Sequence, residues 1–454
     1  MVKDMTRGDP FRLLLSFCIP LISGNIFQQL YSMADTVIVG RALGVKALAA
    51  VGSTGSLNFL VIGFVQGLCS GLTIPISQYF GSGDHKNMRR CAANALWLGA
   101  AGSVLITAVT LFGCRWLLRV MGTPGDISEK AYEYIVIIFA GIPATLFYNL
   151  FSGLLRAVGD SKTPLYFLIF ASFVNIALDL WFVLGLGFGV EGAAWATVLS
   201  QLVSALLCGM YLCRRFRLLL PQKGEWAAAP ALMKKELFIG LPMGLQTSFI
   251  ALGSVILQVA VNSLGSDYVA AMTAGMRVQG LFIHPMEMIG IAMATYCGQN
   301  LGAGYIGRIR QGVRRGMVII TAFAALSWAA VTFGGPCLLG LFVDPGETAV
   351  LDRALLLLRI GAACYPLLGV LFILRNSLQG LGFSVQAMAS GLMEFTARVF
   401  VAFVLVKMWD FLAICLTPPL SWLLADFFLV TAYFYYIRRL QAKAPSPEGP
   451  ARAR

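Results

Sequence analysis

Ionisable side chains stand inside long apolar runs of this sequence, where a charge is costly and therefore points to a function by default. Asp35 and Asp179 are of greatest interest because amide and hydroxyl side chains accompany them at helical spacing. Gln28 and Tyr31 precede Asp35 by seven and four residues, so on a helix they share its face. Asn175 precedes Asp179 by four residues and lies one turn below it.

Such a cluster suits a small cation. Burial favours the neutral, protonated form of a carboxyl group, so H⁺ can bind near neutral pH, and oxygen-rich clusters supply hard ligands for Na⁺. Thr197 is expected at a similar depth in the neighbouring span. We therefore predict ion coupling at four residues, Asp35, Asn175, Asp179 and Thr197. Asn175, Asp179 and Thr197 are candidate ligands of Na⁺. The alternative is that each aspartate only hydrogen-bonds a neighbouring helix or faces an aqueous opening.

The second half of the chain carries different charges. Glu394 and Arg398 are one helical turn apart and can neutralise each other, so a purely structural ion pair is the alternative to a binding role. Glu287 can attract a cationic substrate. Met276 belongs to a methionine-rich stretch, which suits either ordinary packing or a cavity that accepts many shapes. We place the following residues on a predicted substrate pathway: Gln28, Tyr31, Met276, Glu287, Glu394 and Arg398.

The elements that must position these residues are membrane-spanning helices. Of the 454 residues, 58% are hydrophobic and 12% charged, whereas soluble domains carry roughly 45–50% and about 25%. The apolar runs are long and uniform, which favours an all-α polytopic protein over a β-barrel. The twelve predicted spans cover residues 12–39, 47–79, 90–119, 130–157, 163–187, 191–214, 237–264, 268–300, 315–343, 351–380, 386–408 and 411–437.

The net charge of +13 is explained by membrane topology rather than by nucleic-acid binding, because the basic residues form short clusters between apolar runs. With Arg156 and Arg375 counted among loop residues, most Lys and Arg residues fall on the side that also holds both termini. The positive-inside rule then predicts cytoplasmic termini and an even number of spans.

The two halves of the chain repeat each other. A shift of 221 residues pairs Gln78 with Gln299 and Gly81 with Gly302. Because each half has six spans, we predict two six-helix bundles related by a parallel repeat, with substrates binding between them. The predicted division is an N-lobe (1–215), a cytoplasmic linker (216–236), a C-lobe (237–440) and a cytoplasmic tail (441–454).

Other function classes find little support. No phosphate-binding loop motif occurs, so ATP is not an expected partner. The sequence holds two histidines and none of the motifs for metal-dependent or nucleophilic catalysis, so we expect no enzyme and no cofactor besides the coupling ion. A channel is the remaining alternative, but no polar ring is visible.

Four segments carry a resemblance to a known family: residues 28–44, 78–83, 155–164 and 298–304, which read QQLYSMADTVIVGRALG, QYFGSG, LRAVGDSKTP and GQNLGAG. Together with the repeat, they make essentially the whole chain resemble the multidrug and toxic compound extrusion (MATE) family, close to its DinF-like prokaryotic branch. Asp35 stands where that family has its span 1 aspartate. Asn175, Asp179 and Thr197 match the cation site of the N-lobe.

The resemblance implies a V-shaped transporter in the bacterial plasma membrane. It would act as a monomer among membrane lipids and alternate its access, expelling small organic compounds, cationic or amphipathic, in exchange for H⁺ or Na⁺. The alternative is a flippase for lipid-linked oligosaccharides of the same superfamily, which would need several Arg or Lys residues in the cavity to bind pyrophosphate.

Overall fold

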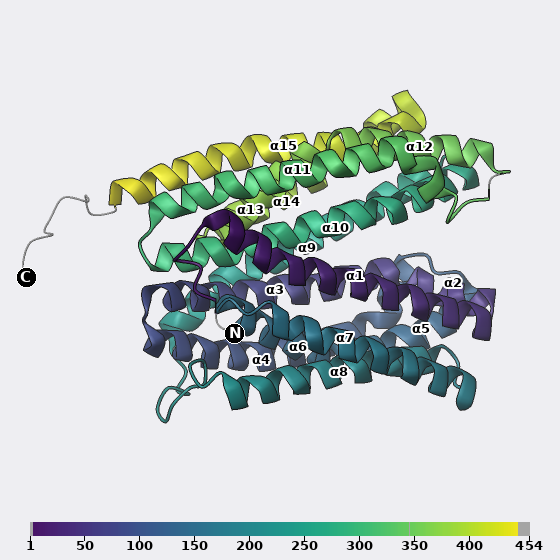
Figure 1. Ribbon diagram of the computed structural model, residues 1–454. Coiled ribbons are helices and arrows are strands. Elements are labelled where there is room, and N and C mark those ends of the chain that lie inside the picture. The colour runs from purple at the N-terminus through teal and green to yellow at the C-terminus, as the bar shows by residue number, and fades with distance from the viewer. Residues whose placement is uncertain (1–2, 345, 444–454) are drawn as a thin grey trace, which may run out of the picture.

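The chain folds almost entirely into helices, as seen in the computed structural model, which describes residues 3–344 and 346–443 (Figure 1). Within those ranges there is no strand. The first half contains α1 (Pro10–Leu43), α2 (Val45–Ser53), α3 (Gly55–Ser82), α4 (His85–Val120), α5 (Gly125–Ala140), α6 (Ile142–Ala157), α7 (Lys162–Asp179), the π-helical turn η1 (Leu180–Gly185) and α8 (Val190–Arg215). The second half contains α9 (Pro230–Asn262), α10 (Ser266–Gly302), α11 (Ile306–Leu339), α12 (Thr348–Ala363), α13 (Tyr365–Gly380), α14 (Ser384–Phe400), the π-helical turn η2 (Val401–Leu405) and α15 (Val406–Lys443).

Among the described residues, eight helical segments are long and apolar enough to cross a membrane, or ten if each of two bent helix pairs forms one span. Helix α10 is not among them, because its polar and charged side chains lower its mean hydropathy. The segment 384–442 passes as a single stretch of 59 residues. A helix of that length would measure roughly 90 Å, about three times the thickness of the hydrocarbon core. Its backbone breaks at Asp410 (φ 45°, ψ −128°), so it provides two spans.

The predicted repeat is visible in the backbone. In each half one span is broken near its middle, α5 to α6 by 45° and α12 to α13 by 52°. A proline lies in the first turn after each break, at Pro143 and Pro366, where its missing N–H costs no helical hydrogen bond. Each half also has one π-helical turn, directly after Asp179 and directly after Phe400. These pairs match at shifts close to those of the sequence repeat.

The two halves form two groups of helices that lie side by side (Figure 1). The first half, coloured purple to teal, lies below, and the second half, green to yellow, lies above. Helix α1 runs along their boundary and contacts α7 of its own half as well as α10 and α11 of the other. Helix α3 packs along α9 across the same boundary. Movement of one half against the other must therefore change the surroundings of α1.

The halves are packed tightly from the middle of α3 to one end of the molecule. A Cβ atom on Gly67 would lie 2.5 Å from the Met243 carbonyl oxygen, and one on Gly71 would lie 2.5 Å from the Gly240 Cα. Only glycine permits this approach of α3 to α9. The N-terminal segment seals the same end: Met5 is fully buried, and its N–H donates to Gln299 Oε1 at 2.8 Å. We call this end the closed end.

Hydrogen bonds between the helices of the two halves concentrate at the closed end. Among the described residues, Gln299 Nε2 donates to the Ala157 carbonyl at 2.9 Å, and Gln78 Nε2 donates to the Gly380 carbonyl at 3.1 Å. The stretch between α8 and α9 is held to α4 by Arg89, whose guanidinium donates two hydrogen bonds of 2.7 and 2.8 Å to Glu225. These bonds lower the pKa of Glu225 from its ordinary 4.5 to about 2.

Candidate functional site

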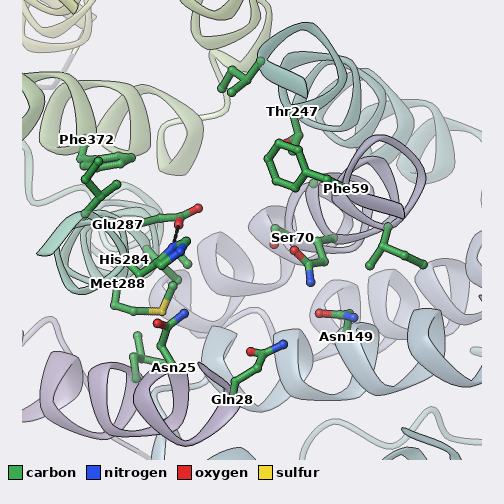
Figure 2. A pocket seen from close by; sticks show the side chains of 18 of the residues that line it. Asn25, Gln28, Phe59, Ser70, Asn149, Thr247, His284, Glu287, Met288 and Phe372 are labelled. Carbon is green, nitrogen blue, oxygen red and sulfur yellow. Dashed lines mark ion pairs between the residues drawn. The ribbon is translucent and has the colours of Figure 1, made fainter. Parts of the chain in front are cut away.

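A cavity of about 820 Å³ lies between the two halves and is lined by residues of both. Figure 2 shows amide side chains of Asn25 and Gln28 from α1 and Asn149 from α6 pointing toward it. His284 and Glu287 of α10 face them from the second half. A cavity of this size, with apolar walls and a few convergent polar groups, is typical of a binding site for a small organic molecule.

The wall formed by α10 carries a charged group. His284 Nδ1 lies 3.6 Å from Glu287 Oε2, one turn apart, and both side chains are partly exposed to the cavity. Met276 lines the same wall two turns earlier on this helix. The methionine can reshape its flexible side chain around different ligands, while the carboxylate offers a partner to a positive charge.

A buried ion-pair network occupies the part of the cavity wall formed by the second half. Arg375 Nη1 of α13 lies 2.7 Å from Glu394 Oε1 of α14, and these side chains are 8% and 4% exposed. Arg398 Nη2 lies farther from the same carboxylate, at 3.9 Å. Its other terminal nitrogen donates to the Ile250 carbonyl at 2.8 Å and to Ser254 Oγ at 2.7 Å. Two guanidinium groups therefore share one carboxylate.

The acidic cluster of the first half lies beside this cavity. Asp35 of α1 and Asp179 of α7 are near enough to interact electrostatically, and both lie within electrostatic range of the Tyr134 hydroxyl group. Asp179 and Asn175 are almost completely buried, and the described residues give neither side chain a hydrogen-bond partner. Two carboxyl groups close together in a poorly polar environment cannot both carry a charge cheaply, so one of them must bind a proton or a cation.

The structure brings most of the predicted ion-coupling residues together. Tyr31 lies on the cavity wall within electrostatic range of Asp35 and Asp179, and so links the cluster to the cavity. Thr197 lines the cavity, but its hydroxyl donates to the Ala193 carbonyl at 3.0 Å and contributes no hydrogen bond to Asp179. The cluster is thus formed by α1 and α7, with Thr197 on the adjoining wall.

All six residues of the predicted substrate pathway line the cavity: Gln28, Tyr31, Met276, Glu287, Glu394 and Arg398. Arg156 and Arg375 are two further cavity residues that the positive-inside rule places among the loop residues. Both lie on helices and line the cavity as well. Each arginine lies within one or two turns of the end of its helix. A count of basic residues on each side of the membrane treats an arginine at that position as part of the loop. The sequence offered no signal for the pairing of Arg375 with Glu394, because Arg398 already stands one helical turn from Glu394.

Comparisons with known proteins agree with this architecture. A family model described as MatE matches residues 20–181 and 242–404. A probable multidrug resistance protein of Bacillus subtilis, YpnP, is 30% identical over 86% of this chain and 87% of its own length. The DNA damage-inducible protein F of Escherichia coli is 26% identical over 66% of this chain and 65% of its own length.

Among solved structures, an outward-facing multidrug resistance MATE transporter of the MOP superfamily superposes with a TM-score of 0.90. The two sequences are 24% identical, and the superposition covers 96% of this chain and 98% of the transporter's chain. The predicted fold of two six-helix bundles is thereby confirmed.

Proposed function

The chain belongs to the MatE family of multidrug efflux transporters, and on this premise we propose that it is a secondary active antiporter. It exports small organic compounds, cationic or amphipathic, by alternating access in exchange for H⁺ or Na⁺. We further propose that it acts as a monomer among the lipids of a bacterial plasma membrane, with both termini in the cytoplasm. The closed end then faces the cytoplasm, and the cavity opens to the outside.

The carboxyl pair of Asp35 and Asp179 is the observation that supports coupling. The two groups come from different helices, α1 and α7, and α1 also contacts the second half. A cation that binds between them removes their repulsion and so favours the arrangement in which they are close. Because a ligand shifts a conformational equilibrium only through unequal binding to the two states, this pair is suited to couple the ion to the movement of the halves.

The identity of the ion depends on the ligands near Asp179. Asn175 and Asp179 together offer unpartnered oxygen atoms within one turn of α7. With Thr197 they form our candidate Na⁺ site, and Thr197 would have to rotate its hydroxyl away from the Ala193 carbonyl to join it. Proton binding needs no such rearrangement, since Asp179 alone can accept the proton.

The charges of the cavity support a multidrug transporter over a flippase for lipid-linked oligosaccharides. A pyrophosphate headgroup needs several cations that are not already compensated. Three arginines line the cavity, but Arg375 and Arg398 share the carboxylate of Glu394. Among the described residues, Arg156 is the arginine of the cavity wall that has no carboxylate partner.

The experiment is transport by the purified protein in liposomes, with rhodamine 6G as the organic cation and with pH and Na⁺ gradients imposed separately. We expect one gradient to drive uptake of the dye and Asp179→Asn to abolish that uptake. The matched control is Asp126→Asn, which removes an exposed aspartate from the first turn of α5. Undiminished gradient-driven uptake by a folded Asp179→Asn variant would overturn the assignment.

A further inference from the structure

Arg156 carries a charge on the cavity wall that nothing in the described structure compensates. It lies in the last turn of α6, mostly buried, and lines the cavity. Among the described residues no acidic side chain forms an ion pair with it. The titratable groups that act electrostatically on Arg156 are Tyr148, Cys208 and Cys69, which are uncharged at neutral pH. An isolated cation in a poorly polar environment is costly, so an anion is the missing partner.

The other arginines of the cavity show the difference. Glu394 compensates Arg375 at 2.7 Å and approaches Arg398, which also donates to a carbonyl and a hydroxyl. Asp160, one turn beyond Arg156, accepts hydrogen bonds from the backbone N–H groups of Lys162 and Thr163, and it caps the start of α7. Its carboxylate is directed to that helix.

The surroundings of Arg156 are those of an anion site. Asn149 points into the cavity in Figure 2, and Gly153 and Arg156 follow it at spacings of four and three residues, on the same face of α6. Ser77 and Ser161 also line the cavity, and the Ser77 hydroxyl donates to the Ile74 carbonyl at 2.8 Å, so Ser161 is the serine with a hydroxyl to offer. A guanidinium group with its planar fork of donors, supported by hydroxyl and amide donors, matches a carboxylate, sulfonate or phosphate.

We propose that Arg156 is the centre of an oxyanion-binding subsite in the cavity, so that the exported compounds include amphipathic molecules with a carboxylate, sulfonate or phosphate group. This inference rests on the proposed function and narrows its substrate class. Glu287, on the opposite half, would bind the positive group of a zwitterionic compound. A molecule with both charges would then bridge the two halves.

The position of Arg156 near the closed end is consistent with this role. Ala157 and Val158, the next residues, accept hydrogen bonds across the seal from Gln299 and Lys3. An anion bound at Arg156 therefore lies directly beside the contacts that must break when the closed end opens. Arg156 also suits the negative end of the α6 dipole, but that partial charge is about half a unit and does not require a side chain that faces the cavity.

The test uses two xanthene dyes of similar shape and opposite charge, fluorescein and rhodamine 6G. Their equilibrium binding to the purified full-length protein in detergent is measured by fluorescence anisotropy, without any ion gradient. The variants are Arg156→Gln, which removes the charge, and Arg156→Lys, which keeps it. The matched control is Arg359→Gln, which removes an exposed arginine of α12 that does not line the cavity.

We expect Arg156→Gln to weaken fluorescein binding about tenfold or more, as expected for the loss of a charge-assisted hydrogen bond, and to leave rhodamine 6G binding unchanged or tighter. Arg156→Lys should retain most of the fluorescein affinity. A purely structural role would instead change both dyes alike. Equal loss for the two dyes, an equal effect of Arg359→Gln, or no fluorescein binding by the wild type would overturn the proposal. Because binding is measured without an ion gradient, the result does not depend on whether the protein couples export to an ion, and the two proposals can fail separately.

Discussion

Removal of the Glu394 carboxylate should destabilise the protein strongly, because it breaks the buried ion pair of Arg375. The buried Asp426 carboxyl group lies within electrostatic range of Arg375 but forms no ion pair with it among the described residues. The two side chains are 8% and 4% exposed and their charged atoms are 2.7 Å apart. Breaking a buried ion pair from one side costs about 3–5 kcal/mol. Arg398 keeps its bonds to the Ile250 carbonyl and Ser254, so the loss is concentrated at Arg375. Since the cavity can admit water beside the pair, we expect the lower end, about 3 kcal/mol, for Glu394→Gln.

A double-mutant cycle isolates the interaction. Arg375→Met removes the stranded charge, so the double variant Glu394→Gln/Arg375→Met should recover much of the stability lost in Glu394→Gln. Denaturant unfolding in mild detergent gives the free energies, with Tm followed in parallel. Glu287→Gln, a half-exposed carboxylate of the same cavity, is the control and should cost less than about 1 kcal/mol. This account of the network would be wrong if Glu394→Gln were as stable as the wild type. It would also be wrong if the double variant were no more stable than Glu394→Gln.

The closed end and the linker allow three further tests. Gly302→Ala would bring a Cβ against the Gln78 carbonyl, so it should cost about 1–3 kcal/mol and lower Tm, whereas Gly307→Ala, with open space around it, should not. Gln299→Leu removes two hydrogen bonds of the closed end, which together contribute about 1–3 kcal/mol. In a Met5→Cys background this variant should therefore react with maleimide roughly 5- to 150-fold faster. An unchanged rate would show that closure of this end does not depend on the two hydrogen bonds. Because the pKa of Glu225 is lowered to about 2, its stabilising effect should be complete above pH 4.5 and disappear as the pH falls toward 2. The unfolding free energies of the wild type and Glu225→Gln should therefore converge over that interval. A difference in free energy that does not change with pH would contradict this prediction.

The sequence was sufficient to predict the architecture because membrane spans depend on strong, repeated signals. Long apolar runs and the 221-residue shift predicted two similar halves, and the structure shows matching bends after Gly141 and Cys364. Helical spacing also predicted that Asn175 and Asp179 share one face, since that relation is local.

Contacts between distant helices were harder to predict. The sequence pairs Glu394 with Arg398 by spacing, but the shorter contact is to Arg375, nineteen residues earlier and on another helix. Arg156 was assigned to a loop because its helix ends one residue later. Such relations depend on how helices cross, which neither hydropathy nor charge counting specifies. The burial of Met5 at the closed end, likewise, has no local signal in a polar N-terminal segment.

Ion movement driven by the organic substrate is the most direct test of the central claim, that cation binding at Asp35 and Asp179 is coupled to export. An antiporter works in both directions, so an imposed gradient of rhodamine 6G across liposomes must move H⁺ or Na⁺ the opposite way, with no ion gradient present. We predict a dye-driven change in the lumenal pH or Na⁺ reporter for the wild type and for Asp126→Asn, and none for Asp179→Asn. Dye movement with no ion movement in the wild type, or ion movement retained in Asp179→Asn, would contradict the account.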